Sequence, residues 1–79
     1  MDKATQRAKI FEYCKKYGSI TVRDAFDALS INSPTKRISE MRKIGYSVQT
    51  VTESKVKESG ETVRYTRYFI NAPEANTHG

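Results

Sequence analysis

The chain has 79 residues, of which 37% are hydrophobic and 29% are charged, and its formal net charge at pH 7 is +5. This composition indicates one small globular domain rather than a disordered chain, and the positive charge favours a polyanionic partner. A single cysteine excludes an intrachain disulfide, and no apolar run reaches 15 residues, which predicts neither a signal peptide nor a membrane span. We therefore expect a cytoplasmic protein with no membrane partner.

The first predicted helix runs from about Lys3 to Tyr17, where apolar side chains recur at steps of three and four residues. These side chains are Ala4, Ala8, Ile10, Phe11, Cys14 and Tyr17. Gly18 ends the helix, and Ser19-Ile20 can form a very short strand after it. Because Cys14 belongs to the apolar side, we expect it to be a small buried residue in a reducing compartment.

The next stretch, residues 20–46, predicts two short helices joined by a tight polar turn. Thr21 and Asp24 have the spacing of a capping box, which begins the first of these helices. Its expected apolar stripe consists of Val22, Ala25, Phe26 and Leu29. The helical pattern breaks at residues 30–32, which places the turn there.

The second of these helices begins with serine at the N-cap, Ser33, and proline at the first helical position, where its missing N–H costs nothing. Ile38, Met41 and Ile44 are expected to be buried, and Gly45 ends the helix. A short helix, a short turn and a basic second helix make a helix-turn-helix, which favours nucleic-acid binding.

After Gly45 the periodicity changes from about 3.6 residues to about 2. Residues 46–52 and 63–70 are rich in β-branched and aromatic side chains and predict an antiparallel hairpin, with a polar loop at residues 54–62. The tail, residues 71–79, has no periodicity, and we expect it to be disordered. The element order predicts an α+β winged helix over residues 1–70, in which three helices pack on a two- to three-stranded antiparallel sheet.

One face of the predicted helix that begins at Pro34 and ends at Gly45 is polar and lies opposite its apolar side on a helical wheel. It carries Lys36, Ser39, Glu40 and Lys43, with Thr35 and Arg42 on one flank. The N-terminal half of such a helix enters the major groove first, and the candidates for base-edge contact are Thr35, Lys36 and Ser39. Phosphate contacts are expected from Arg42, Lys43 and the helix N-terminus at Ser33.

The hairpin supplies a second set of basic side chains, which we expect to contact phosphates as a wing along the DNA backbone. This set consists of Lys55, Lys57, Arg64 and Arg67, and it is diluted by Glu53, Glu58 and Glu61. From residue 33 to residue 68 there are eight basic and four acidic residues, against six and four in residues 1–32. The excess of positive charge is therefore modestly larger in the proposed binding half.

Arg37 and the strand aromatics have structural explanations. Arg37 falls between the two sides of its helix, so we expect its stem to pack on the core and its guanidinium to pair with an acid such as Glu40 or Asp24.

Tyr65 shares a strand face with Phe69, whereas Tyr68 lies on the other face. Since one of these faces must cover the helices, most of the aromatic surface is expected in the core rather than in a platform for stacked bases.

Nothing in the chain indicates an enzyme. His78 lies in the tail, far from Cys14, so no zinc-ligand spacing and no nucleophile–histidine pair exist. The four glycines are scattered and form no phosphate-binding loop. We expect no catalytic residue, no metal, no cofactor and no small-molecule ligand.

The run from residue 4 to residue 48 resembles the short winged helix-turn-helix proteins of bacteriophages and prophages. The matching segments are TQ at residues 5–6, GSIT at 18–21, RISEMRKIGY at 37–46 and GETVRYTRYFI at 60–70. The resemblance covers residues 3–70, and it implies double-stranded DNA as the partner and a small transcriptional regulator of phage or mobile-element genes in a bacterial host cell. Such proteins usually continue their second helix into LGI, whereas this chain has Leu29-Ser30-Ile31, which predicts a wider turn.

Two alternatives stay open. An excisionase-like factor would use the same fold to bend DNA and direct recombination. A winged helix can also be an interaction module that inhibits a host protein, which is favoured by Glu40 and the wing glutamates because phosphates repel carboxylates. No separate dimerisation element is visible, and the oligomeric state stays open, with assembly of a homodimer on the DNA as one option.

Overall fold

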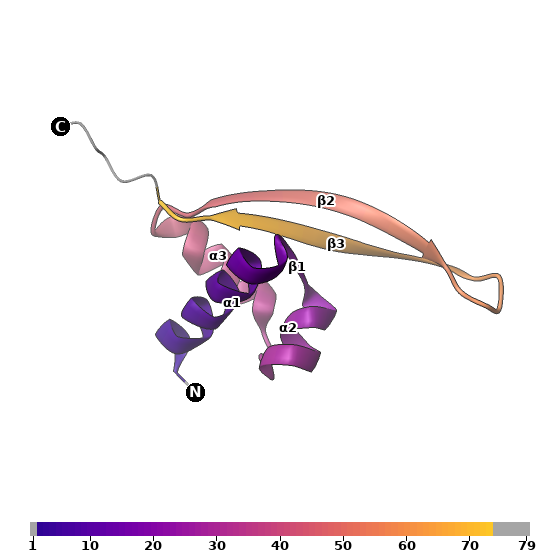
Figure 1. The fold of residues 1–79 in the computed structure, drawn as a ribbon, viewed down its shortest axis with the longest axis horizontal. Coiled ribbons are helices and arrows are strands. Elements are labelled where there is room, and N and C mark those ends of the chain that lie inside the picture. The colour runs from indigo at the N-terminus through magenta and orange to yellow at the C-terminus, as the bar shows by residue number, and fades with distance from the viewer. Residues whose placement is uncertain (1, 74–79) are drawn as a thin grey trace.

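The computed structural model describes residues 2–73, which form three helices and one antiparallel sheet of three strands (Figure 1). In chain order the elements are α1 Lys3–Tyr17, β1 Ile20–Thr21, α2 Val22–Leu29, α3 Pro34–Lys43, β2 Ser47–Val56 and β3 Thr62–Asn71. This is the predicted α+β winged-helix layout. Asn71, expected in the tail, is the last residue of β3, and residues 74–79 of that tail lie outside the described residues.

The first two helices begin at side-chain caps. Asp2 accepts a hydrogen bond from the Thr5 N–H at 2.7 Å and caps α1. At α2, the Thr21 hydroxyl accepts from the Asp24 N–H at 3.1 Å, and the Asp24 carboxylate accepts from the Thr21 N–H at 3.0 Å. The predicted capping box is therefore present, and it fixes the start of the helix-turn-helix directly after β1.

The turn between α2 and α3 lacks the glycine usual in such proteins, and a serine takes its place. Ser30 takes the left-handed conformation, with φ of 57°, that a glycine usually supplies. The Ile31 N–H then donates to the Ala25 carbonyl at 3.0 Å, and Ile31 is buried. The Ser30 N–H also donates to the Phe26 carbonyl at 3.2 Å, so the last carbonyls of the helix are satisfied while serine takes the left-handed position that glycine usually takes.

The helix α3 begins and ends differently from its prediction. Ser33 is the N-cap residue, but its side chain makes no capping hydrogen bond, whereas Pro34 is buried at the first helical position. Ile44, which was predicted to be buried, is 57% exposed because it follows the last helical turn and lies outside the packed side. Gly45 has φ of 108° and redirects the chain into β2.

The sheet has the order β1-β3-β2, and Figure 1 shows the three helices on one side of the long β2–β3 hairpin. Ile20 lies opposite Tyr68, and Val48 lies opposite Ile70. Ile70 is buried and Tyr68 packs against the core, so their strand face covers the helices. Tyr65 and Phe69 lie on the outer face and are half-buried. Both strands extend beyond their predicted ends, and the far half of the hairpin projects past α2 (Figure 1).

The core is small and is drawn from every helix, from the turn between α2 and α3, and from β1 and β3. It consists of Ile10, Cys14, Ile20, Ala25, Ile31, Ile38, Met41 and Ile70. The predicted stripes of α1 and α2 are narrower than expected. Phe26 is 58% exposed and Tyr17 is 61% exposed, and Ala4, Ala8 and Val22 are also exposed. Only a narrow stripe of each of these two helices packs against neighbouring elements. No described element covers the remaining side chains.

Candidate nucleic-acid interface

The helix α3 is divided into a buried and an exposed side. Its buried residues are Pro34, Arg37, Ile38 and Met41. Its exposed residues are Thr35, Lys36, Ser39, Arg42 and Lys43. The exposed side thus contains two hydroxyls and three cations and no acid, so it presents hydrogen-bond donors and positive charge to solvent. The three residues predicted to contact base edges share this side with two of those predicted to contact phosphate.

The helical wheel placed Glu40 on the exposed face, but in the structure Glu40 is half-buried at the edge of that face. Its carboxylate accepts a hydrogen bond from Arg7 of α1 at 2.7 Å and lies 3.1 Å from the Arg37 guanidinium. The hydrogen bond from Arg7, together with the nearby positive charges, lowers the pKa of Glu40 below its ordinary value. The expected stem burial and ion pairing of Arg37 are confirmed, since this residue is only 7% exposed.

The four basic residues of the hairpin differ in exposure, since three are exposed and one is half-buried and hydrogen-bonded. Lys55, Lys57 and Arg64 are exposed. Arg67 is half-buried, and it donates to Glu53 at 2.8 Å and to the Ser19 hydroxyl at 2.9 Å. Arg67 therefore has intramolecular partners on β2 and beside β1, whereas the other three cations face solvent.

A groove of about 820 Å³ lies between the start of α2 and the hairpin. Its lining includes all four basic residues of the hairpin and also Arg23 and Asp24 of α2. Sequence reasoning missed Arg23, whose side chain is 86% exposed and pairs with Asp27 at 3.2 Å. A signal was present, because an arginine at the second position of the helix that precedes the turn is well placed to reach a DNA backbone. The groove brings positive charge from two parts of the chain to one place.

Ser33 is exposed at the N-terminal end of α3 and makes no side-chain cap. This arrangement leaves its hydroxyl available beside the first N–H groups of the helix, where an anion is favoured by the helix dipole. The predicted phosphate contact at this position stays a prediction.

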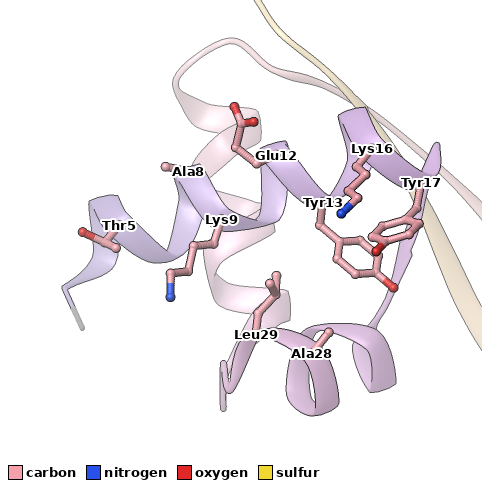
Figure 2. A pocket seen from close by; sticks show the side chains of 9 residues that line it. All are labelled: Thr5, Ala8, Lys9, Glu12, Tyr13, Lys16, Tyr17, Ala28 and Leu29. Atoms are coloured by element: carbon pink, nitrogen blue, oxygen red, sulfur yellow. The ribbon is translucent and has the colours of Figure 1, made fainter.

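A second groove, of about 530 Å³, lies between α1 and α2 (Figure 2). Its lining consists of Thr5, Ala8, Lys9, Glu12, Tyr13, Lys16, Tyr17, Ala28 and Leu29. The Tyr13 and Tyr17 rings lie 4.6 Å apart, centroid to centroid, at one end of it. The surface is mainly apolar, and it lacks the concentration of cations found beside the hairpin.

Within residues 2–73, no group of three metal-ligating side chains comes together, and no helix is long and apolar enough to cross a membrane. Cys14 is buried, and this burial raises the pKa of its thiol to about 11. The thiol is therefore protonated at neutral pH and is a core residue, as expected.

A comparison with protein families matches residues 5–73 to the winged helix-turn-helix domain. The chain belongs to this family. Comparisons with curated proteins and with solved structures found no significant match. By element order, α3 corresponds to the helix called the recognition helix in winged helix-turn-helix domains, and the β2–β3 hairpin corresponds to the wing. The family typically binds DNA in regulatory proteins and is not typically enzymatic.

Proposed function

We propose that this protein binds double-stranded DNA as a small transcriptional regulator of the phage or mobile-element type. The observation that carries the proposal is the exposed side of the recognition helix, which holds only hydroxyls and cations because Glu40 is paired at its edge. The resemblance of the RISEMRKIGY run supports the phage or mobile-element role.

In this proposal, Thr35, Lys36 and Ser39 contact base edges in the major groove. Backbone phosphates are contacted from two places, the recognition helix and the wing. The phosphate-contacting residues are Ser33, Arg42, Lys43, Lys55, Lys57 and Arg64, and we add Arg23. Arg67 is assigned a supporting role, since its guanidinium is already bonded to Glu53 and Ser19.

The proposal is tested by a matched pair of double variants in a fluorescence-anisotropy titration with duplex DNA. Lys36→Ala with Lys43→Ala removes two charges from the recognition helix, and Lys9→Ala with Lys16→Ala removes two exposed charges from α1. We expect the first double variant to bind at least ~10-fold more weakly than the second, because only its lysines contact DNA. Equal affinities of the two double variants would contradict the assignment.

The excisionase-like alternative predicts strong DNA bending and cooperative binding to tandem direct repeats. A circular-permutation gel assay on a selected site distinguishes it from simple occupancy. An unbent single site supports the regulator, and a bend with cooperative repeats supports the architectural role.

A second candidate function, an interaction module that inhibits a host protein, is favoured by one observation, the apolar groove between α1 and α2 (Figure 2). The earlier argument from Glu40 no longer supports it, since that carboxylate is paired within the chain. A Leu29→Lys variant places a charge in this groove. The second function would be supported if the wild-type protein bound one host protein stoichiometrically and the Leu29→Lys variant did not bind it, with DNA binding unchanged.

A further inference from the structure

Glu40 is the one acidic residue in α3, and each of its carboxylate oxygens faces a different arginine. Oε1 accepts a hydrogen bond from Nη1 of Arg7 at 2.7 Å, and Oε2 lies 3.1 Å from Nη2 of Arg37. Arg7 belongs to α1, whereas Arg37 belongs to the preceding turn of α3. A single carboxylate thus links the recognition helix to the helix packed behind it.

This link lies at the edge of the exposed side of α3. Around the helix axis, Glu40 falls between Lys36, which is exposed, and Arg37, which is buried. A contact at such an edge resists rotation of α3 about its own axis, because any rotation moves the carboxylate away from Arg7. The apolar residues Ile38 and Met41 hold the helix in place but contact their neighbours without directional bonds.

The link also removes an unfavourable charge from the site. A free carboxylate beside Lys36 would repel phosphates, and here two guanidinium groups offset it. Arg37 depends on the same carboxylate. Its side chain is 8% exposed, and its Nε has no hydrogen-bond partner among the described residues. Loss of Glu40 would leave a buried guanidinium without its acid.

We propose that Arg7 and Glu40 are positioning residues that set the rotation of the recognition helix and thereby determine which of its side chains reach base edges. Neither residue contacts DNA in this account. The inference rests on the proposed function, since it concerns the specificity of DNA binding.

The test compares Arg7→Gln with Lys9→Gln, which removes the same charge from an exposed position of the same helix. A DNA sequence is first selected by the wild-type protein from a pool of duplexes with a randomised segment. The affinity of each variant is then measured for this selected duplex and for a scrambled duplex of the same composition, and the ratio of the two affinities is the readout.

Both variants lose one positive charge, so we expect similar small losses of affinity for the scrambled duplex. The ratio should fall about 10-fold in Arg7→Gln, the size of one lost base contact, and should stay unchanged in Lys9→Gln. An unchanged ratio in Arg7→Gln would overturn the proposal.

Glu40→Gln separates positioning from simple electrostatics. If the carboxylate only repels phosphates, this variant binds both duplexes more tightly and keeps the wild-type ratio. The positioning account predicts that binding to the scrambled duplex is maintained or tightened while the ratio falls about 10-fold. The double variant Arg7→Gln with Glu40→Gln should lose no more specificity than either single variant, because both break the same link.

Thermal unfolding of each variant serves as the control for folding. If Arg7→Gln is unfolded, Arg7→Lys takes its place, because lysine keeps the positive charge but replaces the planar guanidinium with one ammonium group. Its ratio of the two affinities should lie between that of the wild-type protein and the ~10-fold lower value. A wild-type protein that binds no duplex would refute the proposed function itself. A wild-type protein that binds specifically, with variants of unchanged ratio, would refute only the positioning role.

Discussion

The guanidinium of Arg67 lies 2.8 Å from the carboxylate of Glu53, across the β2–β3 hairpin, and also bonds Ser19 beside β1. One arginine of β3 therefore links β2 to the residue that precedes β1. Arg64, three residues earlier on the same strand, is exposed and lines the groove beside α2.

These two arginines should give opposite phenotypes when each is replaced. Arg67→Ala should lower the melting temperature by several degrees, because it removes two hydrogen bonds that hold the wing. Arg64→Ala should leave the melting temperature within a degree or two and weaken binding to any duplex about equally, as expected for a phosphate contact. Differential scanning fluorimetry and anisotropy on both variants check this, and the reverse pattern would contradict it.

Acid should destabilise the protein through Glu40 and Glu53. The hydrogen bonds from Arg7 and Arg67 lower the pKa of each carboxyl below its ordinary value of 4.5. The unfolded chain therefore binds more protons than the folded protein, and stability is present above about pH 4.5 and is lost as the pH falls through the lower folded values. Urea unfolding between neutral and acidic pH should show this loss, with a flatter dependence in Glu53→Gln. An equally steep loss in that variant would contradict the role of the Arg67 pair.

The left-handed conformation of Ser30 predicts the effects of two substitutions in the turn. Ser30→Gly should change the free energy of unfolding little or raise it by ~0.5 kcal/mol, since relief of strain exceeds the extra freedom of the unfolded chain. Ser30→Val should lower it by ~1–3 kcal/mol, because a β-branched residue is strained at positive φ. Urea unfolding of both variants measures these changes. A stable Ser30→Val variant would show that the turn has another conformation.

The thiol of Cys14 should react slowly in the folded protein. It is buried, and its raised pKa of about 11 leaves very little thiolate at neutral pH. Labelling with a chromogenic disulfide should therefore follow the unfolding rate and become rapid in denaturant. Fast stoichiometric labelling under native conditions would contradict the burial of this residue.

The parts of the fold that depend on local sequence were predictable. The bounds of α1, the capping box of Thr21 and Asp24 and the end at Gly18 all involve residues within a few positions of one another. The full length of the hairpin was not predictable, because the side chains of the second half of β2 are mostly exposed and show little inside–outside alternation. Without such alternation, sequence gives no signal for where a strand ends.

The candidate site was predictable only in part, because some of its contacts join residues that are far apart in the sequence. A helical wheel identifies the exposed positions of α3, and Lys36 and Ser39 are exposed as expected. It cannot show that Arg7, 33 residues earlier, reaches Glu40, or that Arg23 lies beside the hairpin. Burial of Phe26 and Ile44 was wrongly predicted because periodicity gives a direction but does not reveal whether another element covers it. Contacts to DNA remain predictions.

The measurement that tests the central claim most directly is the salt dependence of binding to a random duplex of about 30 base pairs, followed by fluorescence anisotropy. If the recognition helix and wing together neutralise about six phosphates, the logarithm of affinity should fall against the logarithm of salt concentration with a slope of about −5. An affinity that does not change with salt, or no binding at low salt, would contradict DNA binding by this surface.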